Sequence, residues 1–186
     1  MRIVGGIYKG KKLFLPMDKK TRPLKDLVKE SIFNVIEHSN KINLNTKDSL
    51  VLDLFSGSGS FGIECLSREA KEVIFFENYD QAIIVLERNL KSLQNIKNYK
   101  IIKRDCFEYF NSNDKIDFRF NIIFIDPPFK EIRINEIIET ILKKKLLHEN
   151  GIIILHRHKK DNIKLTNKIN ILEERKYGIS NIFFIN

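Results

Sequence analysis

Four consecutive residues that follow an apolar run have side chains able to do chemistry on a planar base: Asp126, Pro127, Pro128 and Phe129. The two prolines fix an extended turn and remove two backbone donors, so the turn offers mainly acceptors. These acceptors are the Asp126 carboxylate and the Pro127 carbonyl, and Phe129 adds a ring that can stack on a base. A base with an exocyclic amino group suits them, because accepting both N–H bonds aims the nitrogen lone pair. We therefore interpret these four residues as catalytic.

A second candidate site lies upstream in residues 50–62, where a short apolar run ends in Asp53 and glycines follow. Gly57 and Gly59 allow a sharp turn and a close approach to a ligand, and Gly62 allows a following helix to pack against the strand. A strand, a glycine turn and a helix N-terminus together are typical of a nucleotide-type cofactor site. The same pattern also occurs in plain tight turns, so the downstream residues decide its meaning.

Acidic residues end four of the predicted strands, at Asp53, Glu77, Asp105 and Asp126. The carboxyl ends of parallel strands meet at one edge, where open α/β sheets bind ligands. Glu77 follows Asp53 at the spacing typical of an acid that binds ribose hydroxyls. Asp105 and Cys106 are placed to hydrogen-bond an adenine amino group. Solvated strand ends and an ordinary core role for Cys106 remain the alternatives.

Hydrophobic periodicity predicts strands that alternate with helices after a basic N-terminal region. Residues 2–15 predict a β-hairpin, from two β-prone runs separated by glycines. Strands are predicted near 50–55, 73–76, 99–102, 121–126, 151–156, 170–175 and 181–185, with helices near 23–38, 61–68, 80–93, 106–110 and 134–145. This alternation predicts a Rossmann-like α/β fold with a mostly parallel sheet. The last two strands have no room for a crossover helix, so they are predicted to pair antiparallel.

The charge distribution favours an anionic partner, with nucleic acid as the first candidate. The chain of 186 residues has a net charge of +9, and residues 1–30 hold nine Lys or Arg against three acids. This concentration predicts a binding surface, with solubility in a Lys-rich protein as the alternative. The predicted phosphate contacts are Arg2, Lys9, Lys11, Lys12 and Arg22.

Composition also favours a cytoplasmic protein of single-domain size. The only cysteines are Cys65 and Cys106, and neither they nor the four histidines have the spacing of metal ligands, so no metal is expected. No apolar run is long enough for a membrane span, and the first residues lack the apolar core of a secretory signal. We expect residues 46–186 to form the Rossmann-like domain, with residues 1–45 as a basic N-terminal extension of the same domain.

The motifs together resemble a known family over nearly the whole chain. Asp-Pro-Pro-Phe after one strand and Asp-Leu-Phe-Ser-Gly-Ser-Gly after another are similar to the class I S-adenosylmethionine-dependent amino-methyltransferases. The bacterial 16S rRNA guanine-N2 methyltransferase family, RsmD, is indicated by three further segments: Arg-Ile-Val-Gly-Gly-Ile-Tyr-Lys-Gly-Lys-Lys-Leu at 2–13, Thr-Arg-Pro at 21–23 and Lys-Glu-Ser-Ile-Phe-Asn at 29–34. Residues 59–70 continue the resemblance. Departures from the family pattern are Leu24, Cys65, Glu69 and His156, and His156 occupies a position that is often acidic.

The resemblance implies a role for each candidate residue. The glycine turn would hold the methionine part of S-adenosylmethionine, Glu77 its ribose, and Asp105 with Cys106 its adenine. Phe129 would stack on a splayed guanine whose N2 is oriented by Asp126. The implied substrate is small-subunit rRNA, within an assembled or assembling 30S subunit, and the expected state is a monomer.

Three other interpretations stay open at this point. An adenine-N6 methyltransferase on RNA or DNA would use the same Asp-Pro-Pro-aromatic turn, although a separate DNA-recognition domain is missing. A non-catalytic rRNA-binding or assembly factor on a methyltransferase fold is a second possibility, which the intact turn opposes. A nicotinamide oxidoreductase is the weakest, because no second substrate domain follows the predicted sheet.

Overall fold

The computed structural model describes residues 1–17, 24–112, 118–161, 165–167 and 169–186 of the chain. Its elements, in order, are α1 (Asp26–His38), β1 (Leu50–Leu54), α2 (Ser60–Ser67), β2 (Glu72–Phe76), α3 (Asp80–Lys91), β3 (Tyr99–Ile102), α4 (Cys106–Asn111), β4 (Phe120–Ile125), α5 (Ile134–Lys143), β5 (Leu147–His158), β6 (Ile171–Tyr177) and β7 (Ser180–Ile185). These bounds confirm the predicted alternation from residue 50 onward. Among the described helices, none is long and apolar enough to cross a membrane.

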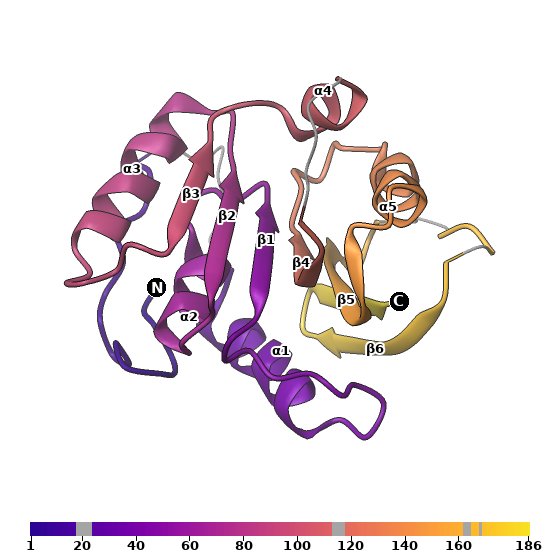
Figure 1. Cartoon of the computed structure of the whole chain (residues 1–186), viewed down its shortest axis with the longest axis horizontal. Coiled ribbons are helices and arrows are strands. Elements are labelled where there is room, and N and C mark those ends of the chain that lie inside the picture. The colour runs from indigo at the N-terminus through magenta and orange to yellow at the C-terminus, as the bar shows by residue number, and fades with distance from the viewer. Residues whose placement is uncertain (18–23, 113–117, 162–164, 168) are drawn as a thin grey trace.

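The seven strands form one sheet in the order β3-β2-β1-β4-β5-β7-β6 (Figure 1). The first five strands of the chain pair parallel to their neighbours, while β7 pairs antiparallel with both β5 and β6. This confirms the mostly parallel sheet with an antiparallel C-terminal pair. The order reverses between β1 and β4, so the carboxyl ends of these two adjacent strands flank the switch point at which such sheets bind ligands.

Alternate residues along the central strands bury against helices on opposite faces of the sheet. One apolar cluster joins α1, α2 and α3 to one face, and a second cluster joins α4 and α5 to the other. In the first cluster the Phe61 ring stacks between Phe33 and Phe124, with centroids 5.3 and 4.0 Å away. Burial on both faces explains why these strands read as continuous apolar runs.

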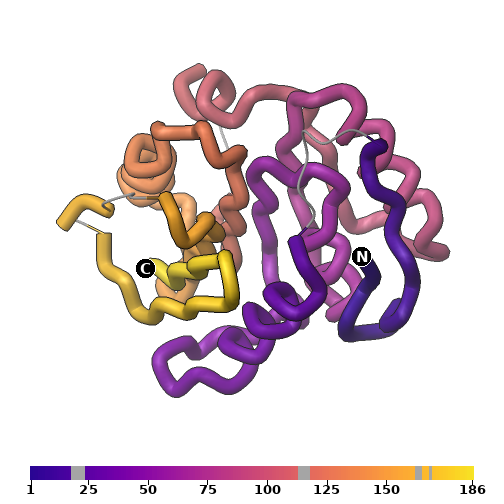
Figure 2. The backbone as a smooth tube through the Cα atoms, turned by 180° about the vertical axis from the view of Figure 1, so that it is seen from behind, coloured from indigo at the N-terminus to yellow at the C-terminus, as the bar shows by residue number. Residues whose placement is uncertain are grey.

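The N-terminal segment differs from the hairpin that was predicted at residues 2–15. Within the described residues 1–17, the strand-like pairing is one isolated bridge between Arg2 and Lys12. Some backbone donors pair across the segment, such as Ile3 N with the Lys11 carbonyl at 2.9 Å, whereas the N–H groups of Val4 and Gly5 donate to the Glu64 carboxylate at 2.8 and 2.7 Å. The segment therefore docks on α2 as a loop, and Figure 2 shows it running beside α2 and α3.

A buried ionic network holds this loop. Glu64 and Lys29 are both fully buried, and Lys29 Nζ lies 3.4 Å from Glu64 Oε2 and donates to the Arg2 carbonyl at 2.7 Å. Arg68 Nε donates to the second Glu64 oxygen at 3.0 Å. Burial is the main reason that the pKa of Lys29 is lowered, against the opposing effect of Glu64. Four donors thus satisfy one buried carboxylate, as burial of a charge requires.

We expect Glu64→Ala to lower the free energy of unfolding by about 3–5 kcal/mol, because it leaves Lys29 buried without its partner. The matched control is Glu69→Ala, which removes the exposed pair between Glu69 and Lys47 at 3.4 Å. That change should cost at most about 1 kcal/mol. Urea denaturation measures both variants. Equal losses would mean that the buried network contributes no more than a surface pair.

Candidate active site at the carboxyl edge of the sheet

The four predicted strand-end acids lie at the carboxyl edge of the sheet. Asp53 is within β1, while Glu77, Asp105 and Asp126 directly follow or closely follow β2, β3 and β4. Since these strands are adjacent and parallel, the sheet brings the four carboxyl groups to one edge. The pKa of Asp53 is raised first by burial, and then by the nearby charges of Asp126 and Glu77.

Asp53 is buried at the centre of the sheet, where its carboxylate accepts a hydrogen bond from Gly62 N at 2.9 Å. Burial raises the pKa of Asp53 well above its usual range, and the Gly62 bond opposes that shift only in part. The bond ties the end of β1 to the first turn of α2. The structure therefore gives Asp53 a position beneath the glycine turn rather than on its outer surface.

The glycine turn is built around Gly57 and Glu77. Gly57 has a φ of +56°, in the left-handed region, and a Cβ placed there would meet open space. Its N–H donates to Glu77 Oε2 at 2.7 Å, and the amides of Asn78 and Tyr79 donate to Glu77 Oε1 at 3.0 and 2.9 Å. The turn thus presents bare backbone next to an acid, which is a cradle suited to a nucleoside ligand.

Gly59 and Gly62 are needed for packing. A Cβ on Gly59 would lie 2.4 Å from Leu86 Cδ1 on α3, and a Cβ on Gly62 would lie 2.3 Å from the Phe75 ring on β2. The close approach of helix and sheet predicted for Gly62 is present. For Gly59, contact with α3 supplies a reason for glycine besides the predicted cofactor contact.

Asp105 begins α4 and faces the neighbouring strand end. One of its oxygens accepts from the amides of Phe107 and Glu108 at 2.8 and 3.1 Å, which makes it the N-cap of the helix. The other accepts from Asn78 Nδ2 at 3.2 Å. Cys106 is buried, and burial raises the pKa of its thiol above the usual range, so it is held as a thiol.

The Asp126 carboxylate is held by a chain of polar side chains from two further strands. Its Oδ1 lies 2.8 Å from His156 Nδ1 on β5, and His156 Nε2 lies 2.9 Å from Ser180 Oγ on β7. The Asp126 side chain is 22% exposed, so one side is held while the other is accessible. Phe129 is 39% exposed, and its ring meets the His158 ring edge-on at 5.1 Å.

Arg157 fixes the backbone that follows Pro127. It is buried, and its guanidinium donates to the carbonyls of Pro128, Phe129 and Glu131 at 3.4, 3.1 and 3.4 Å. Asp161 balances its charge at 3.1 Å. Burial lowers the pKa of Arg157. The shape of the turn therefore depends on β5 as well as on its prolines.

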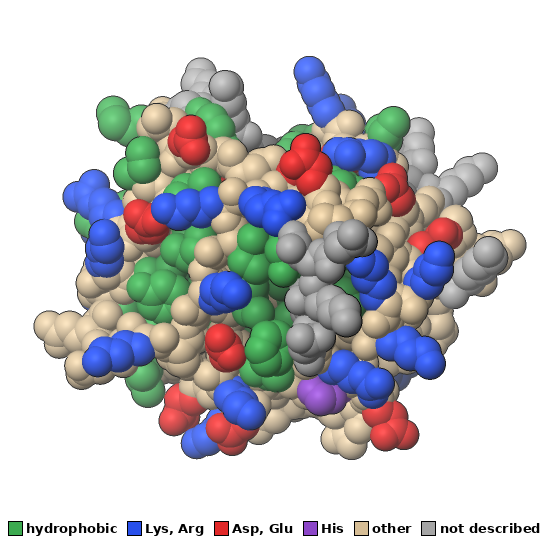
Figure 3. Space-filling view, turned by 45° about the horizontal axis from the view of Figure 1, so that its top comes forward, with side chains coloured by type: hydrophobic (Ala, Val, Ile, Leu, Met, Phe, Trp, Pro, Cys, Tyr) green, Lys and Arg blue, Asp and Glu red, His purple; other side chains and the backbone are tan. Residues whose placement is uncertain are grey.

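The predicted phosphate contacts have different environments. Lys9 and Lys12 are exposed, and exposed Arg2 lies 3.5 Å from Asp26. Lys11 is partly buried and donates to the Ser92 carbonyl at the end of α3, which gives it a structural contact. Arg22 lies outside the described residues. Figure 3 shows Lys and Arg side chains spread around a hydrophobic area on the face that includes the carboxyl edge.

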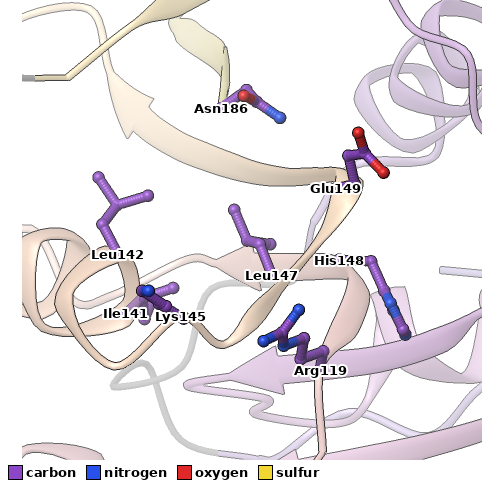
Figure 4. A pocket seen from close by; sticks show the side chains of 8 residues that line it. All are labelled: Arg119, Ile141, Leu142, Lys145, Leu147, His148, Glu149 and Asn186. Carbon is purple, nitrogen blue, oxygen red and sulfur yellow. The ribbon is translucent and has the colours of Figure 1, made fainter.

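A cavity of about 440 Å³ lies elsewhere, at the amino ends of β4 and β5. Figure 4 shows its lining, which comes from the residue before β4, the end of α5 and the turn after it, the start of β5, and the last residue: Arg119, Ile141, Leu142, Lys145, Leu147, His148, Glu149 and Asn186. The chemistry-bearing residues are at the other end of these strands, so this cavity is separate from the candidate active site.

Sequence reasoning missed several residues that position the site. Buried Asn89 donates to the carbonyls of Ser58 and Phe14 at 2.9 and 3.1 Å, which joins the glycine turn to the N-terminal segment. Phe55 has a φ of +60°, a strained conformation for an aromatic residue. The position of Asn89 on the apolar face of a predicted amphipathic helix could have indicated its role. No sequence pattern indicated the positive φ of Phe55.

The fold and the site define the class as a methyltransferase with a Rossmann-like sheet, and comparison with known proteins agrees. The solved structure of "Putative methyltransferase yhhF from Escherichia coli" has a TM-score of 0.82 and 25% sequence identity, covering 100% of this chain and 96% of that one.

The particular family follows from the sequence comparisons. Residues 1–186 match the family model "Conserved hypothetical protein 95". The chain is 32% identical to "Putative rRNA methyltransferase YlbH" of Bacillus subtilis, over 98% of this chain and 96% of the relative. It is 34% identical to "Ribosomal RNA small subunit methyltransferase D" of Escherichia coli K12, over 81% of this chain and 68% of the relative. The chain therefore belongs to this methyltransferase family.

The raised pKa of Asp53 predicts how the stability of the protein changes with pH. Because the folded pKa is raised above the unfolded value near 4, the native state holds the extra proton between these two pKa values. Stability from this residue is therefore lost as pH rises through that interval. Asp53→Asn cannot ionise, so its melting temperature relative to the wild type should increase from pH 4 to pH 8. We expect about 2–4 °C for each kcal/mol of penalty removed.

Scanning calorimetry of both proteins across this pH range measures the difference. A difference in melting temperature that does not change with pH would mean that Asp53 keeps an ordinary pKa in the folded protein.

Proposed function

We propose that the protein uses S-adenosylmethionine to methylate the exocyclic N2 of a guanine in 16S rRNA. The observation that carries this proposal is the Asp126 carboxylate, oriented by His156 and placed in an Asp-Pro-Pro-Phe turn on the strand next to the glycine turn. The names of the relatives support ribosomal RNA of the small subunit as the substrate class. We further propose a cytoplasmic monomer that acts on an assembled or assembling 30S subunit.

The residues at the edge fit S-adenosylmethionine. The bare backbone at Gly57 would take the methionine part, Glu77 would bind the ribose, and Asp105 with Cys106 would flank the adenine. When bound, this cofactor supplies an electrophilic sulfonium methyl. Gly59 and Asp53 would act from below, by keeping the turn and α2 in place.

The proposed chemistry is positioning of a nucleophilic amine. A guanine cannot be reached while it is stacked, so it would be splayed out to lie on Phe129. Asp126 and the Pro127 carbonyl would accept the two N2 hydrogens and aim the nitrogen lone pair at the methyl group. Arg157 holds the carbonyls that follow Pro127, so the turn is preorganised before the base arrives.

The exposed basic residues of the N-terminal segment would contact phosphates. Lys9 and Lys12 are the best placed for this role, and Arg2 would exchange Asp26 for a phosphate. Lys11 would contribute mainly by fixing the segment to α3. Because Glu64 also binds this segment to α2, we propose that the phosphate contacts keep a fixed position relative to the carboxyl edge of the sheet.

Methylation of adenine N6 is the second candidate, since the same acceptors suit any exocyclic amine. A non-catalytic RNA-binding protein is a third candidate. Such a protein would not need the hydrogen bonds that hold the Asp126 carboxylate and the turn in one orientation. Nucleoside analysis of the product separates the first two, and methyl transfer by the pure protein separates both from the third.

The proposed cofactor site predicts that Gly57→Ala weakens S-adenosylmethionine binding by about tenfold or more, or ~1.4 kcal/mol. The added methyl group would enter the space proposed for the ligand. Gly178→Ala is the matched control, because Gly178 has a φ of +58° and also faces open space. Both variants place alanine at a similar positive φ. The difference in S-adenosylmethionine affinity between them, measured by calorimetric titration, therefore reports the effect on the ligand. Equal affinity in the two variants would contradict this cofactor position.

The proposed role of Asp126 predicts an effect on turnover. Asp126→Ala should lower the single-turnover rate by about 10²- to 10³-fold, the scale for one preorganised polar contact in a transition state. Asp126→Asn keeps an acceptor oxygen and should retain more activity than Asp126→Ala. S-adenosylmethionine affinity should stay unchanged in both. Transfer at the wild-type rate by Asp126→Ala would make the turn purely structural.

A further inference from the structure

Three hydrogen-bonded side chains at the carboxyl edge of the sheet, Asp126, His156 and Ser180, form an arrangement that the sequence did not predict. The side chain of His156 is 15% exposed, and Ser180 is buried. They come from β5 and β7, which pair antiparallel, and His156 faces the same side of the sheet as Ile152 and Ile154. The C-terminal strand pair therefore reaches the reactive edge through Ser180, at the first position of β7.

The hydrogen-bonding capacities of the three groups fix the roles of the imidazole nitrogens. An ionised carboxylate can only accept, so His156 Nδ1 carries the proton that it shares with Asp126 Oδ1. In the neutral imidazole the other nitrogen then accepts, and the Ser180 hydroxyl is the donor within reach. The Asp126 carboxylate thus selects the Nδ1–H tautomer, and the Ser180 hydroxyl is the donor that this tautomer needs at Nε2.

This bond leaves Asp126 with one oxygen committed and one available. Without a donor at Nδ1, the carboxylate could turn about its side-chain torsions and present either oxygen in several directions. A misplacement of about 1 Å in a reacting group can cost about 10²-fold in rate. A carboxylate held in one orientation should therefore give a higher rate of methyl transfer than the same carboxylate free to rotate.

We propose that His156 is a positioning residue for methyl transfer, which holds the Asp126 carboxylate so that Oδ2 meets the substrate amine, and that Ser180 supports this tautomer of His156 by donating to Nε2. This inference rests on the proposed function for its kinetic consequence, although the tautomer itself does not. His156 does not touch the reacting atoms. Its effect is on turnover through Asp126, with cofactor binding left unchanged.

The kinetic experiment compares three substitutions in methyl transfer to small subunits from a deletion strain. His156→Ala should lower kcat by about 10- to 100-fold with little change in KM for S-adenosylmethionine. His156→Asn places an amide N–H close to the position of Nδ1 and should recover most of that loss. Ser180→Ala should lower kcat by a smaller factor. His148→Ala, at the far end of the same strand, is the control and should match the wild type.

Several outcomes would overturn the inference. If the wild type is active and His156→Ala keeps its kcat, His156 does not position Asp126, while the proposed function stands. Equal losses in His156→Ala and His156→Asn, or a loss seen in KM for the cofactor, would indicate a role in folding or cofactor binding. Absence of transfer by the wild type to any RNA or subunit would count against the proposed function.

A spectroscopic measurement tests the inference without any substrate. Nitrogen-15 spectra of the histidine-labelled protein at alkaline pH should show His156 as the Nδ1–H tautomer. Asp126→Ala should shift the population toward the Nε2–H form, and Ser180→Ala should shift it by a smaller amount. A wild-type protein with the Nε2–H tautomer would overturn the inference whatever the protein does to RNA.

Discussion

The arrangement of the catalytic edge depends on the burial of the Asp53 carboxylate beneath the glycine turn. Its bond to Gly62 N joins the end of β1 to the first turn of α2, so the residues between them must loop out at the carboxyl edge. Burial of this group is unfavourable for its charged form and therefore raises its pKa. The protein accepts this cost at the switch point between β1 and β4, where the sheet opens for a ligand.

Two other bonds make the glycine turn rigid from different directions. Glu77 receives the Gly57 N–H from the side of β2, and Asn89 donates to the Ser58 carbonyl from α3. The catalytic turn beyond β4 is held in the same manner, since Arg157 binds its carbonyls and His156 its carboxylate. Each loop is thus fixed by a buried or half-buried side chain from a neighbouring element. Such preorganisation is what catalysis by positioning requires.

Local patterns predicted the fold because β1, β2 and β4 are mostly apolar runs buried on both faces, while α3 and α5 each have one apolar stripe. The strand-end acids and the Asp-Pro-Pro-Phe turn could be placed on one edge by the rule for parallel sheets alone. The hairpin predicted at 2–15 is present only as one isolated bridge, since the N–H groups of Val4 and Gly5 bind Glu64, about 60 positions away. The partnership of His156 with Ser180 also depends on the pairing of β5 with β7, which a single sequence does not reveal.

We propose that the carboxyl edge of the sheet transfers a methyl group to the exocyclic amine of a guanine in small-subunit rRNA. The most direct test incubates the purified wild-type protein with labelled S-adenosylmethionine and small subunits from a deletion strain, and then identifies the labelled nucleoside by mass spectrometry. We expect N2-methylguanosine confined to 16S rRNA. Label in N6-methyladenosine, or no label in any RNA or subunit offered, would contradict it.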